Sequence, residues 1–295
     1  MSTILDELAG AVQAVASTVA PAVVHVGRGW HGGSGVVIAD GRILTNAHNV
    51  HADTVALTFA DGRVAEGSVS GMDVDGDLAV ITADTTGVTA LTWSPEGAIV
   101  AGIPVFAVAA AESGPRITFG LVSGVARAFR GPRGRLISGS IEHTAPMAPG
   151  SSGSALVDGS GRLIGLNTNR VGGGFYLAIP ADAALISRVE ALGRGEAPRR
   201  ARLGVGLAPS GAARTMRRAV GLPERDGVLV RDVEDDGPAA KAGMAAGDLI
   251  VAAGGKALSS ADDLADALAS AGSSLELTLV RGVDERVVRV DVAPA

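Results

Sequence analysis

Residues 149–156 read Pro-Gly-Ser-Ser-Gly-Ser-Ala-Leu, and they place Ser152 on a short stretch between two glycines. Glycine permits backbone conformations that other residues resist, so the N–H groups of Gly150 and Ser152 can converge on one point. Two such donors form an oxyanion hole, which stabilises the charge that develops on a carbonyl oxygen under nucleophilic attack. Apolar residues follow, so the turn is expected to open onto a strand. Read alone, the octet is also typical of a plain turn.

The composition indicates a globular protein with cores built from aliphatic residues. The chain has 295 residues, of which 47% are apolar, 19% charged and 3% aromatic. This length is sufficient for two or three cores, and the 42 glycines favour short strands and tight turns. The net charge of −6 argues against nucleic acid as the main partner. Because there is no cysteine, disulfides, thiolate catalysis and Cys-based zinc sites are excluded. We expect no cofactor and no metal.

The N-terminal segment 1–26 predicts an amphipathic helix. Its apolar residues recur at helical spacing, Ser2 or Thr3 can cap the helix, and Asp6 and Glu7 suit its first turn. No basic residues precede the apolar positions, so we expect neither a signal peptide nor a membrane span. The sequence as it stands therefore indicates a cytoplasmic protein, or a periplasmic or extracellular one if a leader peptide was removed.

The segment that follows predicts an all-β unit. Short apolar strands alternate with turns rich in Gly, Asp and Pro as far as residue 180, which is typical of a barrel or sandwich. Residues 181–192 have helical composition and close the unit. The polar segment 193–202, with Gly, Pro and four arginines, is interpreted as a linker.

Two candidate catalytic side chains lie beside strands of this unit. His48 lies at the end of a strand, where a histidine is either a buried structural group or a base. Asp77 directly precedes the apolar strand Leu78–Ile81, and Asp73 and Asp75 are its rivals or belong to a solvated turn. We set a calcium loop aside, because no glutamate follows at EF-hand spacing and a strand follows in place of a helix.

The order His48, Asp77, Ser152 is that of the serine proteases built from two β-barrels. The surrounding motifs resemble the HtrA/Deg family of serine proteases and keep its spacing over most of residues 17–192. They are TNAHNV (45–50), DGRVAEGSVSGMDVDGDLAVI (61–81), PGSSGSALVDGSGRLIGLNTN (149–169) and FYLAIP (175–180). The resemblance implies a mainly β fold, a chymotrypsin-like double β-barrel, for a protease domain of residues 1–192 that includes the N-terminal helix.

The resemblance also implies a role for each site residue. His48 falls on the general base, Asp77 on the carboxylate that orients it, and Ser152 on the nucleophile. The loop of Gly150, Ser151 and Ser152 falls on the oxyanion hole, with the amides of Gly150 and Ser152 as donors. These residue types suit the chemistry, because a serine hydroxyl is a weak nucleophile until an imidazole accepts its proton. A carboxylate fixes the tautomer of that imidazole and stabilises its charged form.

The chain departs from the family pattern at several positions around the site. Asn49 replaces a usual valine, and Ser151–Ala155 replaces Asn-Ser-Gly-Gly-Pro. His143–Pro146 replaces Thr-Asp-Ala-Ala, Ala110–Gly114 replaces Gly-Asn-Pro-Phe-Gly, and Tyr176 stands in place of a glycine on the pocket-lining strand. The departures affect regulation and side-chain specificity and leave the triad in place.

The C-terminal segment 203–295 resembles a PDZ domain of the HtrA type, an α+β fold. LGVGL (203–207) opens it, GPAAKAGM (237–244) follows, and Ser260 caps a helix expected over Ala261–Ala271. The resemblance implies a carboxylate-binding loop of Leu203, Gly204 and Val205, beside which the C-terminal peptide of a partner adds as a strand. The alternative is that these glycines only make turns.

Two functions remain open from the sequence. The first is an ATP-independent serine endopeptidase of protein quality control, which cleaves unfolded or damaged polypeptides through an acyl-enzyme. Its PDZ domain would bind substrate or regulatory C-termini, and the family resemblance implies a homotrimer. The second is a non-catalytic peptide-binding protein or chaperone on the same fold, with the triad held out of register. The altered loops at 110–114 and 143–146 keep the second function in view.

Overall fold

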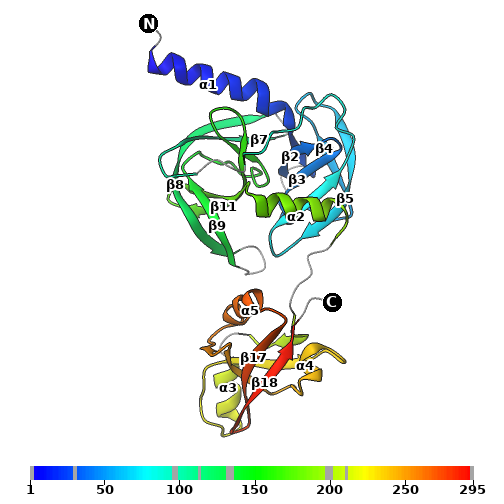
Figure 1. The fold of residues 1–295 in the computed structure, drawn as a ribbon, viewed down its shortest axis with the longest axis vertical. Helices are drawn as coiled ribbons and strands as arrows, with labels where there is room; N and C mark the ends of the chain where they lie inside the picture. Colours follow the sequence, from blue (N-terminus) through cyan, green and yellow to red (C-terminus); the bar gives the residue numbers. More distant parts are fainter. Residues whose placement is uncertain are drawn as a thin grey trace. The chain divides into compact units, whose positions relative to one another are not determined.

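The computed structural model describes residues 3–28, 32–94, 99–111, 114–130, 136–196, 202–209 and 212–292. The chain divides into two units, Met1–Pro198 and Arg199–Ala295, each described here by itself (Figure 1). Residues 197–201 of the predicted linker lie outside the described residues. The predicted domain boundaries at 192/193 and 202/203 therefore stay predictions.

The first unit consists of two closed antiparallel barrels. The first barrel is ordered β1-β2-β3-β6-β5-β4 and the second β10-β11-β12-β9-β8-β7. The first contains β1 (Val23–Val26), β2 (Gly33–Ala39), β3 (Arg42–Thr45), β4 (Thr54–Thr58), β5 (Val64–Asp73) and β6 (Leu78–Thr82). The second contains β7 (Pro104–Ala109), β8 (Arg116–Arg130), β9 (Leu136–His143), β10 (Ala155–Val157), β11 (Leu163–Gly172) and β12 (Phe175–Pro180). The predicted double β-barrel is confirmed.

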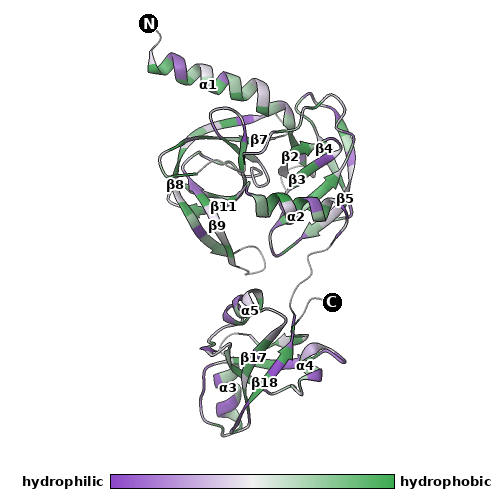
Figure 2. Cartoon of the chain, viewed as in Figure 1, coloured by the Kyte–Doolittle hydropathy of each residue, from purple (hydrophilic) through white to green (hydrophobic). Residues whose placement is uncertain are grey.

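A shared hydrophobic core holds the two barrels together. One cluster of buried residues includes Val36 and Leu57 from the first barrel and Phe106 and Leu166 from the second. In Figure 2 the strands of the first barrel around β2 and β3 are coloured mostly hydrophobic. Because the cluster is continuous, the loops of one barrel keep a fixed position against the loops of the other.

One α-helix precedes the strands of the barrels in the chain, and another follows them. Thr3, one of the two caps that the sequence predicts, begins α1 (Ile4–Val19) with a capping box to Asp6. The short helix η1 (Ala20–Ala22) leads from α1 into β1, and α2 (Ala183–Gly193) follows β12 and contacts β5 and β6. Among the described residues, no helix is long and apolar enough to cross a membrane.

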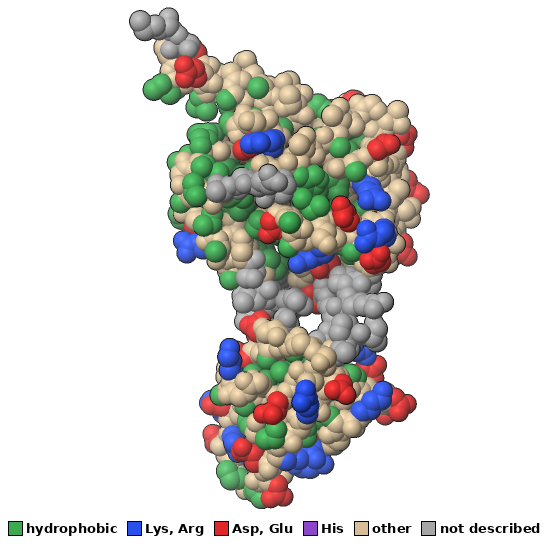
Figure 3. All heavy atoms as spheres, in the orientation of Figure 1, with side chains coloured by type: hydrophobic (Ala, Val, Ile, Leu, Met, Phe, Trp, Pro, Cys, Tyr) green, Lys and Arg blue, Asp and Glu red, His purple; other side chains and the backbone are tan. Residues whose placement is uncertain are grey.

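The outer face of the second barrel carries apolar side chains. Phe119, Leu121 and Val125 of β8 are each more than 40% exposed. Figure 3 shows hydrophobic side chains gathered on the left flank of the first unit, where Figure 1 places β8. The residues Ile4 and Leu5 at the start of α1 are also exposed.

The described residues of the second unit form a sheet with three helices around it. The strand order is β13-β14-β15-β17-β18, with β16 paired to β15. Its strands are β13 (Val205–Leu207), β14 (Val228–Val233), β15 (Leu249–Ala253), β16 (Lys256–Ala257), β17 (Ser274–Arg281) and β18 (Asp284–Asp291). Its helices are α3 (Ala212–Ala219), α4 (Pro238–Lys241) and α5 (Ala261–Ser270). Ser260 caps α5 with a capping box to Asp263, so the predicted cap is confirmed, and the helix ends one residue earlier than expected. The edge position of β13 leaves one side of that strand without a sheet partner in the described chain.

Candidate active site

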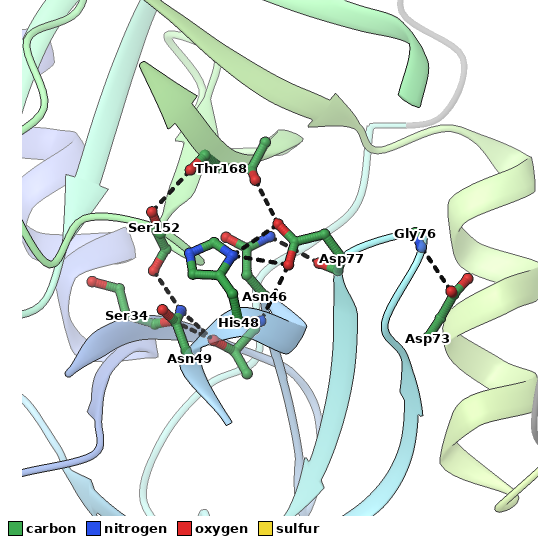
Figure 4. Close-up of polar contacts among 10 residues, drawn as sticks. Ser34, Asn46, His48, Asn49, Asp73, Gly76, Asp77, Ser152 and Thr168 are labelled. Atoms are coloured by element: carbon green, nitrogen blue, oxygen red, sulfur yellow. Dashed lines mark hydrogen bonds and ion pairs between the residues drawn. The ribbon is translucent and has the colours of Figure 1, made fainter. Parts of the chain in front are cut away.

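His48 and Asp77 form a hydrogen-bonded pair at the end of the first barrel. His48 lies in the short helix η3 (Ala47–Asn49), directly after β3, and its Nδ1 lies 2.9 and 3.0 Å from the two carboxylate oxygens of Asp77. Asn46 donates from its side-chain amide to the backbone carbonyl of Asp77, at 2.9 Å, and ties the two loops together. With Nδ1–H donating to Asp77, Nε2 is left as the basic nitrogen of a neutral ring (Figure 4).

The carboxylate of Asp77 is buried and fully supplied with donors. Its residue is 1% exposed, and the carboxylate also accepts from the amide of His48 at 3.2 Å and from the hydroxyl of Thr168 at 2.7 Å. A buried carboxylate requires several such donors to satisfy its oxygens. Its rival Asp73 instead accepts from the amide of Gly76 at 2.7 Å and so supports the turn that leads into Asp77. Of the three aspartates in the described turn, Asp77 is the one that contacts His48.

Ser152 comes from the second barrel and is held by the first. Its backbone carbonyl accepts from the amide of Ser34 at 2.8 Å and from the side chain of Asn49 at 2.9 Å. Its hydroxyl donates to the backbone carbonyl of Thr168 at 2.9 Å (Figure 4). No hydrogen bond joins this hydroxyl to His48 within the part of the chain that the structure describes. Attack by Ser152 therefore requires its hydroxyl to leave the Thr168 carbonyl and turn to Nε2 of His48.

Of the three backbone amides at residues 150–152, two are free in the described chain and one is hydrogen-bonded. Gly150 has a φ of +83°, a conformation that favours glycine, and its carbonyl accepts from the Ser34 hydroxyl at 3.0 Å. The amides of Gly150 and Ser152 have no acceptor among the described residues. The Ser151 amide donates to the carbonyl of Ala148 at 3.2 Å. The Ser151 amide is therefore not free to bind an oxyanion. Of the three residues expected to form the oxyanion hole, only Gly150 and Ser152 have an amide that is free in the described chain.

Comparison with known proteins gives this geometry a family. Residues 33–166 match a trypsin-like peptidase domain, and residues 229–281 match a PDZ domain. The serine endoprotease DegS of Escherichia coli (strain K12) is 30% identical to this chain, with 97% of this chain and 87% of the relative covered. The chain belongs to the HtrA/Deg family of serine proteases.

Other HtrA/Deg proteins agree in sequence and in fold. A probable periplasmic serine endoprotease of Halomonas elongata is 32% identical over 88% of this chain. The chain covers 56% of that relative, and so spans about half the length of several of the curated relatives it matches. Among solved structures, the HtrA-type protease AlgW with decapeptide superimposes with a TM-score of 0.67 at 25% identity, covering 96% of this chain and 98% of that chain. A serine endoprotease from Yersinia pestis gives a TM-score of 0.66 at 27% identity, again over 96% and 98% of the two chains.

Two departures of this HtrA/Deg chain from the family pattern lie against each other beside the site. His143 is fully buried, and this burial lowers its pKa to about 4 although its Nε2 lies 2.9 Å from the side-chain oxygen of Asn167. Tyr176 stacks on the ring of His143 with a centroid distance of 5.9 Å. Asn167 in turn donates to the hydroxyl of Ser154, two residues beyond Ser152. Contacts between neutral side chains thus connect Tyr176 of β12, through His143 and Asn167, to the loop that carries Ser152.

The predicted carboxylate-binding loop of the PDZ domain lies just before its edge strand. Leu203 is buried, its carbonyl accepts from the amide of Ala239 at 2.8 Å, and its own amide has no acceptor among the described residues. The amide of Gly204 is likewise free in this part of the chain, and its φ is +72°. Val205 begins β13. These are the features that a backbone anion site requires.

Three supporting residues were not predicted from the sequence: Ser34, Asn46 and Thr168. Thr168 contacts both Asp77 and Ser152, and together with Asn167 it directly follows the apolar run Leu163–Leu166 of β11. Polar residues that continue such a run are the signal that could have indicated a role, because polar groups that become buried need specific partners. Among the described residues, no group of three or more His, Asp or Glu side chains is placed so that it could hold a metal ion.

Proposed function

We propose that this protein is an ATP-independent serine endopeptidase of protein quality control, acting on unfolded or damaged polypeptides. The observation that carries the proposal is the His48–Asp77 pair facing a nucleophile loop with two free amides. The names of the relatives, which are serine endoproteases, support the same activity. The chemistry requires only the substrate and water, so no nucleotide enters it.

The reaction would proceed through an acyl-enzyme. Ser152 transfers its proton to Nε2 of His48 as its oxygen attacks the carbonyl carbon of the scissile peptide. Asp77 stabilises the imidazolium that forms, and the amides of Gly150 and Ser152 bind the oxyanion. His48 then returns the proton to the leaving amine. Water repeats the sequence and releases the acyl group as a carboxylate.

The non-catalytic alternative receives less support. The observation in its favour is that the Ser152 hydroxyl is hydrogen-bonded to the carbonyl of Thr168 and not to His48. Catalytic hydrogen bonds are often long or poorly aligned in structures without substrate, so this position does not argue against catalysis. The altered loops at 110–114 and 143–146 leave the His48–Asp77 pair assembled.

Replacement of Ser152 by Ala tests the activity directly. Hydrolysis of casein should be lost, and His48→Ala should reduce it comparably because the triad acts as a unit. Ser160→Ala is the matched control, since Ser160 lies exposed in the turn between β10 and β11. Casein turnover by Ser152→Ala at the parental rate would contradict the assignment of the nucleophile.

We propose that the PDZ domain binds the free C-terminus of substrate or regulatory polypeptides at Leu203, Gly204 and Val205. Two free amides in this loop and the unpaired edge of β13 support the proposal. Amidation removes the charge and an acceptor oxygen, and a hydrogen bond to a charged group is worth about 1.5–3 kcal/mol. An amidated peptide should therefore bind roughly ten- to a hundredfold more weakly. The full-length Ser152→Ala protein is suitable, because it cannot cleave the peptide. Equal affinity for free-acid and amidated peptides would contradict the proposal.

Assembly and location are proposals that rest on the family. We propose a homotrimer, and the exposed apolar residues of α1 and β8 offer surface for contacts between subunits. We also propose that the protein acts in the periplasm, as the names of several relatives state for those proteins. Sedimentation equilibrium tests the first proposal and cell fractionation the second. A monomer at all concentrations, or recovery in the cytoplasm, would contradict them.

A further inference from the structure

Arg170 is an exposed residue of β11, the strand whose Thr168 accepts from the hydroxyl of Ser152, and the triad does not account for it. It follows Thr168 by two residues on β11, about 7 Å of extended chain. Its guanidinium donates from Nη2 to the carbonyl of Met147 at 2.7 Å, and Met147 lies five residues before Ser152. The Arg170 side chain therefore bridges the two chain segments that flank Ser152, residues 147–151 and 168–170.

The guanidinium of Arg170 lies over the ring of Tyr176. Its Cζ is 5.5 Å from the ring centroid of Tyr176, the cross-strand partner of Arg170 on β12. Tyr176 is itself held on the ring of His143, which is buried and bonded to Asn167. With its pKa lowered to about 4, His143 is neutral at ordinary pH and does not repel the cation.

The charge of Arg170 has no counter-ion in the described chain. No carboxylate of the described residues lies within 4 Å of its guanidinium, and one backbone carbonyl takes only part of its five N–H donors. Arg162, at the turn before the same strand, is by contrast paired with Asp158 at 3.0 Å. The fork of a guanidinium matches a carboxylate, so the free donors of Arg170 suit an acidic group.

We propose that Arg170 determines which side chain the enzyme accepts at the residue whose carbonyl is attacked, and that it selects glutamate or aspartate. The proposal rests on the endopeptidase function proposed above. When the oxyanion lies at the amides of Gly150 and Ser152, the side chain of that residue enters between the segments that flank Ser152. A carboxylate there meets the free donors of Arg170. A lysine or arginine is repelled, and a large apolar side chain strips water from an unpaired charge.

The test uses peptides that differ only at the residue before the scissile bond. Glutamate and glutamine have nearly the same shape, so their kcat/KM ratio isolates the charge. The parent enzyme should favour the glutamate peptide by roughly ten- to a hundredfold, as expected for a hydrogen bond to a charged group. Arg170→Gln should bring the ratio close to one, and Arg170→Glu should favour a lysine peptide. Arg162→Gln removes the same charge from the same barrel and should keep the parental ratio.

Equal rates for the glutamate and glutamine peptides in the parent enzyme would overturn the proposal, whatever the folding of the variants. A parental ratio in Arg170→Gln would also overturn it, since another group would then bind the carboxylate. A fluorophosphonate probe distinguishes failure of the specificity proposal from failure of the proposed endopeptidase function. If Ser152 is labelled while no acidic preference is seen, only the specificity proposal fails. If the parent enzyme hydrolyses no peptide and is not labelled, the endopeptidase function fails, and the specificity proposal with it.

Discussion

Asp77 combines an unusual backbone with a fully bonded side chain. Its φ of +55° lies in the left-handed region that residues other than glycine rarely adopt, at a cost on the order of 1–3 kcal/mol. The conformation aims the carboxylate at both the ring and the amide of His48, while the hydroxyl of Thr168 satisfies the remaining side. The backbone strain is thus offset by charge-assisted hydrogen bonds that set the orientation of the base.

Thr168→Val should slow the reaction without unfolding the protein. Valine keeps the volume and the backbone carbonyl, and it removes the one hydroxyl that donates to Asp77. A hydrogen bond to a charged group is worth about 1.5–3 kcal/mol, so kcat should fall roughly ten- to a hundredfold with little change in KM. Steady-state kinetics with a fluorogenic peptide measure both. Thr168→Ser retains the hydroxyl and should keep most of the activity; a parental kcat in Thr168→Val would show that this bond does not matter.

The buried imidazole of His143 should make the first unit less stable in mild acid. Its pKa is about 4 in the folded protein and 6.5 when unperturbed. The stability it contributes is therefore complete above pH 6.5 and is lost as the pH falls towards 4, because only the unfolded chain binds the proton. At pH 5 the loss is on the order of 2 kcal/mol.

Urea unfolding at pH 7 and pH 5 measures this loss. Both tryptophans of the chain have sequence positions within 1–198, the range of the first unit, so tryptophan fluorescence follows its transition. The decrease in the free energy of unfolding from pH 7 to pH 5 should be about 2 kcal/mol smaller in His143→Thr than in the parent. Equal drops would indicate that His143 is already protonated in the folded protein at pH 5.

The residues of the site divide according to how far their partners lie in the sequence. His48, Asp77 and Ser152 were identified from local motifs, and the structure brings His48 and Asp77 together. Ser34 and Thr168 were not identified, because their partners at Gly150 and Asp77 lie 116 and 91 residues away. No local pattern encodes such a pairing. For the same reason, the Ser152 hydroxyl's contact with Thr168 could not be predicted.

The nucleophile loop of the second barrel is inserted against the first barrel. Ser34 of β2 binds two groups of the loop, and Asn49 binds the carbonyl of Ser152. Gly153 fits because it has no side chain: a Cβ there would lie 2.1 Å from the carbonyl oxygen of Ser34, and its φ is +83°. The fit of these two elements is therefore set by close backbone approach.

Gly153→Ala should disrupt this fit, whereas Gly159→Ala should not. Gly159, in the exposed turn after β10, has no atom within 4 Å of an added Cβ and no positive φ. We expect Gly153→Ala to lower the free energy of unfolding by more than about 2 kcal/mol and to abolish hydrolysis, and Gly159→Ala to change stability by no more than about 0.5 kcal/mol. Urea unfolding and casein assays compare the two. Equal stability of the two variants would show that the loop can move away from Ser34.

The elements were predicted better than their pairing. Alternating apolar strands and Gly-containing turns indicated most of the strands, and the capping residues Thr3 and Ser260 marked two helix starts correctly. Helix α3 was missed, because it is short and four of its eight residues are polar or charged. Closure of the barrels depends on contacts such as β1 with β4 and β7 with β10, which join strands distant in sequence.

At the scale of the whole molecule, catalysis depends on the first unit being assembled from both barrels. The base and its carboxylate come from the first barrel, and the nucleophile and the oxyanion amides come from the second. The shared core and the bonds from Ser34 and Asn49 fix their relation. The second unit has its own core and carries the peptide-binding loop proposed above. The central claim is thus that Ser152 is a nucleophile activated by His48.

Covalent labelling of the full chain with a fluorophosphonate probe, located by mass spectrometry, tests this claim most directly. The probe reacts with a serine only when a base activates it. We predict a single label on Ser152 in the parent protein, and a rate at least about a hundredfold lower in His48→Ala. Absence of labelling, labelling of another serine, or an equal rate in His48→Ala would contradict the account.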